Sequence, residues 1–349
     1  MGGDKLDEQW KGFLCVAGAA LLWGVAGNVA KYLFNQQVDP VDLAQMRLFF
    51  SFFFLAFYLA LFRRPLLRPL RPHLLPLTLL GLFGITAVQV TYLLAISRTN
   101  VATAIFLQYL APALVMGYGL LSGAEKPALK NALAVAFALA GGFLMVKGAP
   151  AGGLAVNPAG VLAGLLSACA FAFYTVYGKR LLSLYSPWTI LFWGFGTGSV
   201  LFCLRRPPWE TFFAYGPVEW LFFGYIAVFS SIIPFGLYIM GLRYTSAVKA
   251  NLTSTLEPVL AGLLAFFFLG ERLTPLQMAG GALILGGVIL IQLFSGQDHP
   301  VDQPADAGDD HLHRIPRPDG ADARRCAGEN DVPGQQGHYR RNETDQPGH

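Results

Sequence analysis

Histidine is nearly absent from the first 294 residues. Five of the six histidines lie beyond Ser295, which leaves His73 alone in the long N-terminal part of the chain. Acidic residues are also scarce there, because 11 of the 21 lie from Ser295 onward. Catalysis by a histidine base or by paired acids is therefore nearly excluded in that part of the chain.

Cysteine and charge are scarce as well. The four cysteines contain no Cys-x-x-Cys pair, so neither a disulfide framework nor a zinc site is indicated. Charged residues make up only 13% of the chain and hydrophobic residues 54%, whereas soluble domains carry about a quarter charged residues. Too few polar side chains remain to cover the surface of a soluble fold.

Long apolar runs fill residues 13–294. A bilayer core needs about 20 mostly apolar helical residues per crossing, and ten runs of roughly that length are separated by loops rich in Gly, Pro and Arg. The sequence therefore predicts an all-α integral membrane protein with ten transmembrane helices. The predicted spans are 13–33, 44–62, 74–97, 101–121, 129–147, 158–182, 188–204, 218–242, 248–269 and 276–294.

The loop charges predict how these spans are oriented. With the N-terminus (1–12) inside, 12 of the 19 Lys and Arg of residues 1–294 fall on the cytoplasmic side, where basic residues are favoured. Ten spans then place both termini in the cytoplasm, with the pair Arg205-Arg206 as the main exception. Residues 295–349 are polar and without apolar periodicity, and we expect a disordered tail.

The two halves of the apolar part resemble each other. Six residue pairs share a spacing of 146 positions. They are Tyr92 and Tyr238, Thr99 and Thr245, Ala104 and Ala250, Leu110 and Leu256, Pro112 and Pro258, and Glu125 and Glu271. We expect two five-helix repeats, 13–147 and 158–294, joined by a linker at 148–157. Because five is odd, the second repeat would cross the membrane in the opposite sense, as inverted repeats of secondary transporters do.

A family resemblance rests on the order of several short motifs. In the second half they are Arg243-Tyr-Thr-Ser-Ala-Val-Lys-Ala-Asn, Leu256-Glu-Pro-Val, Leu269-Gly-Glu-Arg-Leu-Thr-Pro-Leu-Gln and the glycine-rich segment 280–287. In the first half they are Leu22-Trp23-Gly24 with Asn28, then Arg47, and then Ala111-Pro112 with Glu125. The chain resembles EamA-type transporters of the drug/metabolite transporter superfamily. The resemblance implies a ten-helix bundle with a central cavity open alternately to each side, and export or uptake of small metabolites such as amino acids, nucleosides, sugars or drugs.

One ionisable residue lies near the middle of a predicted span. Glu257 is about nine residues into the span 248–269 and precedes Pro258, which frees a backbone carbonyl nearby. A charge inside a membrane costs about 2.5 to 3.5 kcal/mol on insertion scales, so it indicates function. Glu257 either couples protons to transport or receives a substrate amine; the alternative is a neutral, hydrogen-bonded carboxyl that packs helices.

Other polar and aromatic residues could line the same cavity. Asn251 and Ser254 share a helical face with Glu257 at spacings of three. The remaining candidates for substrate binding or coupling are Gln108, Asn28, Gln89, Tyr92, Trp23 and Tyr174. Each could instead form hydrogen bonds or packing contacts between helices.

Arg47 has two interpretations. Its side chain snorkels to the headgroups or forms a structural pair, which we favour, or it points inward to bind an anion. A cavity with both Arg47 and Glu257 would suit a zwitterion such as an amino acid. Arg47→Gln should then weaken carboxylate-bearing substrates more than cationic drugs.

These expectations combine into a function without a cofactor. We expect a secondary active transporter, an exporter of amino acids or related compounds or of drugs, in a prokaryotic inner membrane, because no Gly-x-x-x-x-Gly-Lys-[Ser/Thr] loop is present. Partners would be a small-molecule substrate, lipid, protons and a second copy through the glycine-rich spans. The alternatives are a membrane-embedded enzyme, which the lack of His and Asp in the spans disfavours, a channel, and a non-transporting membrane partner.

Overall fold

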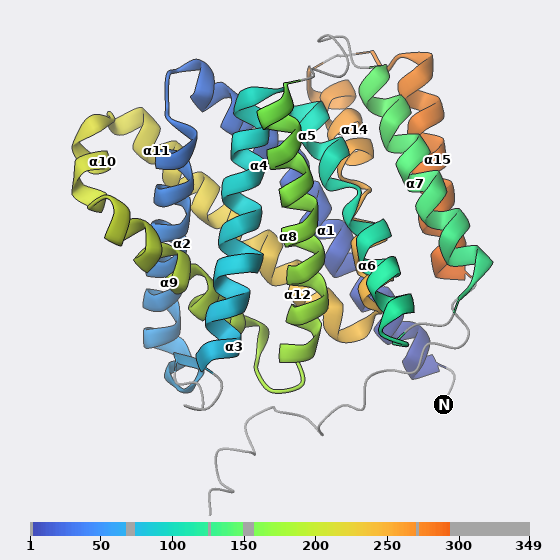
Figure 1. Cartoon of the computed structure of the whole chain (residues 1–349), viewed down its shortest axis with the longest axis horizontal. Coiled ribbons are helices and arrows are strands. Elements are labelled where there is room, and N and C mark those ends of the chain that lie inside the picture. The colour runs from blue at the N-terminus through green and yellow to red at the C-terminus, as the bar shows by residue number, and fades with distance from the viewer. Residues whose placement is uncertain (1–2, 68–73, 125–126, 149–156, 270–271, 294–349) are drawn as a thin grey trace, which may run out of the picture. The chain divides into compact units, whose positions relative to one another are not determined.

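The computed structural model describes residues 3–67, 74–124, 127–148, 157–269 and 272–293, and the regular structure of these residues is helical throughout (Figure 1). The expected disordered tail lies outside the described residues, as do Glu125 and Glu271. All the elements below belong to one compact unit, residues 1–304.

The helices follow one another in the order of the predicted spans. The first half comprises α1 (Gly3–Asn35), α2 (Pro40–Phe62), the 3₁₀ turn η1 (Arg64–Leu67), α3 (Leu74–Leu79), the π-helix η3 (Leu80–Thr86), α4 (Ala87–Arg98), α5 (Val101–Gln108), α6 (Ala111–Leu121) and α7 (Leu129–Lys147). The second half comprises α8 (Pro158–Leu181), α9 (Pro187–Arg205), α10 (Pro208–Ala214), α11 (Pro217–Tyr225), the π-helix η4 (Ile226–Ile232), α12 (Ile233–Tyr244), α13 (Ala247–Ser254), α14 (Glu257–Leu269) and α15 (Pro275–Leu293).

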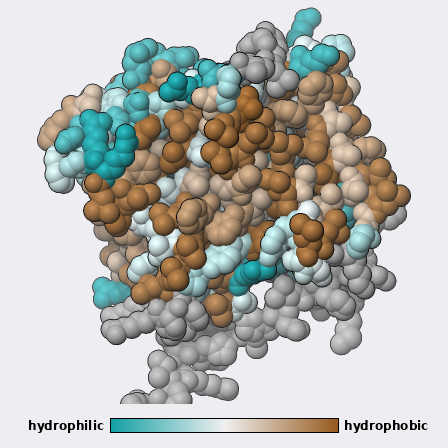
Figure 2. Space-filling model, viewed as in Figure 1, coloured by the Kyte–Doolittle hydropathy of each residue, from teal (hydrophilic) through white to brown (hydrophobic). Residues whose placement is uncertain are grey.

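Nine helical stretches of the described residues are long and apolar enough to cross a membrane. They coincide with nine of the ten predicted spans. The other predicted span, 248–269, consists of the shorter helices α13 and α14 with a turn between them. Large apolar side chains lie on the surface, including Leu121 at 91% exposure, and Figure 2 shows them covering the middle of the visible face. Lipid, not water, is the solvent that suits such a surface.

Capping residues explain where several helices begin. The side chains of Asp39, Asn157 and Ser186 accept hydrogen bonds from the first backbone amides of α2, α8 and α9. Each is followed by a proline at the first helical position, where the missing amide hydrogen costs nothing.

Two of the predicted spans break at corresponding places. Two turn residues separate α5 from α6, and two separate α13 from α14. The second residue of α6 is Pro112 and that of α14 is Pro258. A proline cannot donate to the carbonyl four residues earlier, here those of Gln108 and Ser254. Helix ends and polar backbone groups are thereby placed inside the bundle.

The glycine-rich helices α7 and α15 pack against each other. A Cβ atom at Gly141 would lie 2.5 Å from the carbonyl oxygen of Gly280, and one at Gly280 would lie 2.6 Å from that of Gly141. Only residues without a side chain permit this approach. The glycines of these two helices therefore make a close backbone contact within the chain.

Candidate functional site

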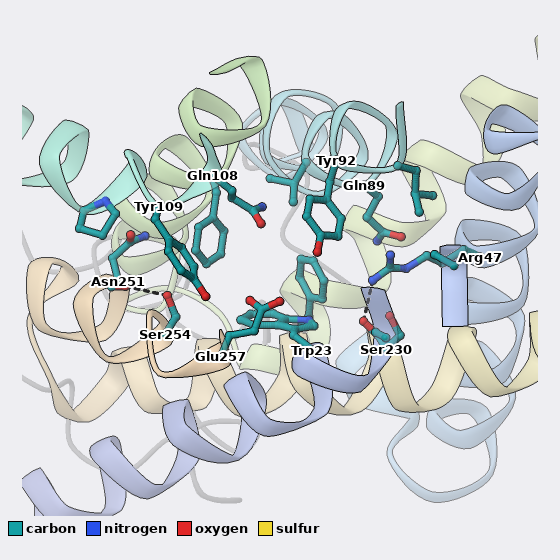
Figure 3. A pocket seen from close by; sticks show the side chains of 17 residues that line it. Trp23, Arg47, Gln89, Tyr92, Gln108, Tyr109, Ser230, Asn251, Ser254 and Glu257 are labelled. Carbon is teal, nitrogen blue, oxygen red and sulfur yellow. Dashed lines mark hydrogen bonds between the residues drawn. The ribbon is translucent and has the colours of Figure 1, made fainter. Parts of the chain in front are cut away.

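A cavity lies where the broken helices meet the rest of the bundle (Figure 3). Its empty volume is about 650 Å³ when the open space at its mouth is included. Its walls come from α1, α2, α4, α5, α6, α8, η4, α12, α13 and α14. Eight of the predicted site residues line it, namely Trp23, Arg47, Gln89, Tyr92, Gln108, Asn251, Ser254 and Glu257.

Arg47 points into this cavity from α2. Its side chain is buried, Nε donates to Ser231 Oγ at 2.6 Å, and Nη2 donates to the carbonyl oxygen of Ser230 at 2.6 Å. The snorkelling interpretation is therefore wrong, because the guanidinium is held inward by η4. The sequence could not show this, since Ser231 is 184 positions away.

Glu257 is the first residue of α14 and faces the cavity from the side opposite Arg47 (Figure 3). Its side chain is buried. The ion pairs within the described part of the chain both involve Arg206, so Glu257 and Arg47 are not paired with each other. A carboxyl group and a guanidinium group thus line one cavity without forming an ion pair with each other.

Several buried polar atoms in the cavity wall have no hydrogen-bond partner among the described residues. They are Gln89 Oε1 and Nε2, the hydroxyl oxygens of Tyr92 and Tyr109, and Asn251 Oδ1. A buried polar group left without a partner costs about 1–3 kcal/mol. A polar ligand or water in the cavity would satisfy these atoms.

Asn251 is fixed by its amide nitrogen. Nδ2 donates to Thr175 Oγ1 at 2.9 Å and to Tyr238 Oη at 3.3 Å, which leaves Oδ1 as an acceptor. One turn later, Ser254 Oγ donates to the carbonyl oxygen of Asn251 at 2.6 Å. Across the cavity, Gln108 Nε2 donates to Ser167 Oγ at 3.1 Å.

Aromatic rings form the apolar part of the wall. Trp23 packs edge-on against Phe171 and Phe235, with ring centroids 5.9 and 5.3 Å apart. These rings offer an apolar substrate a surface and keep water from the polar groups beside them.

Two predicted site residues do not line the cavity. Asn28 is exposed on the surface of α1. Tyr174 is fully buried behind the cavity wall, where its hydroxyl donates to the carbonyl oxygen of Phe235 at 3.3 Å. Conversely, the sequence prediction missed Tyr109, which directly follows Gln108 at the helix break, and Ser230, a polar residue four positions before Pro234.

Comparison with known proteins agrees with this architecture. The model of the EamA-like transporter family matches residues 10–147 and again residues 158–293. The chain belongs to the EamA-like transporter family. The suspected resemblance is thereby confirmed, and the chain is a multi-pass membrane transporter, which implies a small-molecule substrate and a lipid environment.

Relatives from bacteria and archaea carry transporter names. The uncharacterized inner membrane transporter YicL of Salmonella typhimurium is 32% identical over 288 residues, covering 82% of this chain and 96% of the relative. An uncharacterized transporter of Archaeoglobus fulgidus is 34% identical over 266 residues, covering 76% and 91%. One solved crystal structure shares the fold with a TM-score of 0.65 at 21% identity, covering 81% of this chain and 96% of the other.

Proposed function

We propose that this transporter is a secondary active carrier that exports amino acids or related small metabolites carrying both a negative and a positive charge. The observation that carries the proposal is that Arg47 and Glu257 face one cavity unpaired, with several unpartnered polar atoms around them. A zwitterion with an apolar side chain would satisfy both charges and pack on Trp23. The lining holds one carboxylate and no histidine or aspartate, so the side chains for an acid–base reaction do not assemble there.

Alternating access is the mechanism that this proposal requires. In this mechanism, α13 and α14 together form the tenth membrane crossing. The two halves of the chain are inverted repeats, and both termini lie in the cytoplasm. Support comes from the family match to each half and from the helix breaks at corresponding places. Broken helices and inverted repeats mark the binding sites of many secondary transporters.

Glu257 is the residue that we assign to coupling. A carboxyl group that loses or gains a proton as it meets a substrate amine would link transport to a proton gradient. Without such a group the substrate amine would have no acidic partner in the cavity, and transport could not draw on the gradient.

Flux into proteoliposomes tests the proposal. The purified protein is assayed with labelled amino acids, nucleosides and cationic dyes, with and without an imposed pH gradient, alongside Glu257→Gln. Glu8→Gln is the matched control, since Glu8 does not line the cavity. Saturable, gradient-driven amino acid flux that only Glu257→Gln abolishes is expected. Flux that is unchanged by the pH gradient would disprove the proposed proton coupling. Absence of amino acid flux would overturn the proposed substrate class.

A further inference from the structure

The position of the Arg47 guanidinium depends on the π-helix η4. Ser231 Oγ accepts from Arg47 Nε and donates to the carbonyl oxygen of Ile226 at 3.3 Å. The second contact of Arg47 is to the carbonyl oxygen of Ser230. Both serines are buried, with exposures of 0 and 1%, so water does not compete for these hydrogen bonds. The guanidinium is therefore held at two points from one helical segment.

Pro234 explains why the carbonyl oxygen of Ser230 can accept from Arg47. In an α-helix this oxygen would accept from the amide of the residue four positions later. That residue is Pro234, near the start of α12, and proline has no amide hydrogen. The proline thus removes the α-helical donor for this oxygen, and the donor that a π-helical turn would supply is the amide of Phe235. The oxygen that accepts from Arg47 therefore lacks its α-helical partner.

The first half of the chain has no such arrangement at the corresponding place. Counting back 146 positions, η4 corresponds to η3, and Ser231 and Pro234 correspond to Ile85 and Val88. Ser231 contacts Arg47 of α2, whereas Ile85 packs its side chain against Gly194 of α9, so that an added Cβ at Gly194 would lie 2.3 Å from Ile85 Cδ1. The cationic end of the cavity is therefore built on one side only.

The free edge of the guanidinium faces the cavity. Nη1 of Arg47 makes no hydrogen bond within the described part of the chain, and Gln89 Nε2, beside it in Figure 3, has none either. Two N–H groups on a planar fork with an adjacent amide donor suit a carboxylate. Glu257 lies away from this end, beside Tyr109.

Resting on the proposed function, we propose that Ser231 and Pro234 are positioning residues that aim Arg47 at the carboxylate of the substrate, so that the carboxylate binds between α2 and η4 and the amine binds at Glu257. Neither residue needs to touch the substrate. Ser231 fixes Nε, and Pro234 keeps the carbonyl oxygen of Ser230 available, so that Nη1 stays turned toward the cavity.

Three small molecules of similar shape test the binding of the negative and the positive charge separately. Leucine carries both, leucinamide only the positive charge, and 4-methylpentanoate only the negative one. Their affinities are measured on the purified full-length protein from the rise of its unfolding temperature with probe concentration. Ser231→Ala and Pro234→Ala should weaken leucine and 4-methylpentanoate about fivefold or more, which corresponds to one charge-assisted hydrogen bond. Leucinamide should bind both variants as it binds the wild type.

Two further variants separate positioning from packing. Ser231→Thr keeps the hydroxyl and should restore the affinity for the acid. Ser51→Ala is the matched control, because the buried hydroxyl of Ser51 bridges the same two elements, α2 and η4, by donating to the carbonyl oxygen of Ala227, whereas the hydrogen bonds of Arg47 go to Ser230 and Ser231. It should leave all three affinities unchanged. If Ser231→Ala does not fold, Pro234→Ala and Ser231→Thr carry the same comparison.

The outcomes distinguish this inference from the proposed function. The positioning role is overturned if Arg47→Gln no longer binds leucine and 4-methylpentanoate while Ser231→Ala and Pro234→Ala bind both with unchanged affinity. The proposed function would then stand. If these variants lose as much affinity for leucinamide as for the two carboxylate probes, the defect is a general one. That result would also overturn the positioning role. If neither leucine nor 4-methylpentanoate stabilises the wild type, both proposals fall.

Discussion

Nη1 of Arg206 donates to both carboxylate oxygens of Asp42, at 2.9 and 3.1 Å. The contact joins the end of α9 to the first turn of α2, and Tyr215 Oη adds a third hydrogen bond to the same carboxylate at 3.0 Å. Asp42 is the better shielded partner, with 11% side-chain exposure against 38% for Arg206. This cluster fixes the start of α2, about one and a half turns before Arg47.

Asp42→Asn should lower the unfolding temperature of the purified protein. The variant loses the ion pair and weakens two hydrogen bonds, so we expect a cost of about 1 kcal/mol. Glu210→Gln is the control, because Glu210 bonds the same arginine from a side chain that is 53% exposed, and solvent screens that pair. A larger loss in Glu210→Gln than in Asp42→Asn would contradict this ranking.

Tyr215 gives a prediction about pH. Burial of its ring, and in lesser part its hydrogen bond to Asp42, raises the pKa of the phenol to about 12, above the free value of about 10. Because the folded pKa is the higher one, the stabilisation is complete below about pH 10 and is lost as the pH rises through about 12. The difference in unfolding temperature between the wild type and Tyr215→Phe should thus be constant from about pH 7 to 9 and shrink above. A difference that grows above pH 10 would disprove the assignment.

Tyr109→Phe should separate binding from stability. The Tyr109 hydroxyl is buried without a partner among the described residues, so its removal should leave the unfolding temperature equal or higher while weakening substrate binding. In Tyr238→Phe the lost hydroxyl is bonded to Thr175 and Asn251, and we expect a cost of about 1 kcal/mol. Thermal unfolding with and without substrate checks both. Equal destabilisation of the two variants would show that the Tyr109 hydroxyl has a partner in the protein.

Gly141→Ala should disrupt the contact between α7 and α15. Its Cβ would meet a backbone oxygen of Gly280 that cannot move independently, and overpacking of this kind costs about 1–3 kcal/mol. Gly117→Ala in α6 is the matched control, since its Cβ would meet nothing within 4 Å. That variant should be stabilised by up to about 1 kcal/mol, because alanine favours the helix. A Gly141→Ala protein as stable as the control would contradict the close approach.

Helix boundaries were predictable because their causes are local. Asp39 and Ser186 cap the helices that the following prolines begin, and these signals can be read without tertiary structure. The break before Glu257 was visible only in part. Pro258 indicates a weakened helix, but the length of the turn depends on how the two halves pack.

Helical spacing was enough to predict which residues of one helical stretch line the cavity. Asn251, Ser254 and Glu257 line the cavity together, as their spacing of three predicts. Asn28 was misassigned because its polarity was taken as the signal. The cavity face of α1 is instead set by Trp23, with two small alanines, and Asn28 points elsewhere on the helix.

Contacts between distant segments were beyond the sequence. The inward orientation of Arg47 follows from Ser231, on a helix far along the chain, and no local pattern links them. Such a pairing is fixed by tertiary packing alone.

The two π-helices occupy equivalent positions in the two halves of the chain. Leu80–Thr86 and Ile226–Ile232 each span 7 residues, and both bounds of the second lie 146 positions after those of the first. A π-turn accommodates one more residue than the α-helical turn it replaces. A single family description fits each half, and each half carries its irregular turn at the same place. Only the second of these turns carries the two serines that contact Arg47 and is followed by Pro234, so two segments with the same irregular backbone present different chemistry to the bundle.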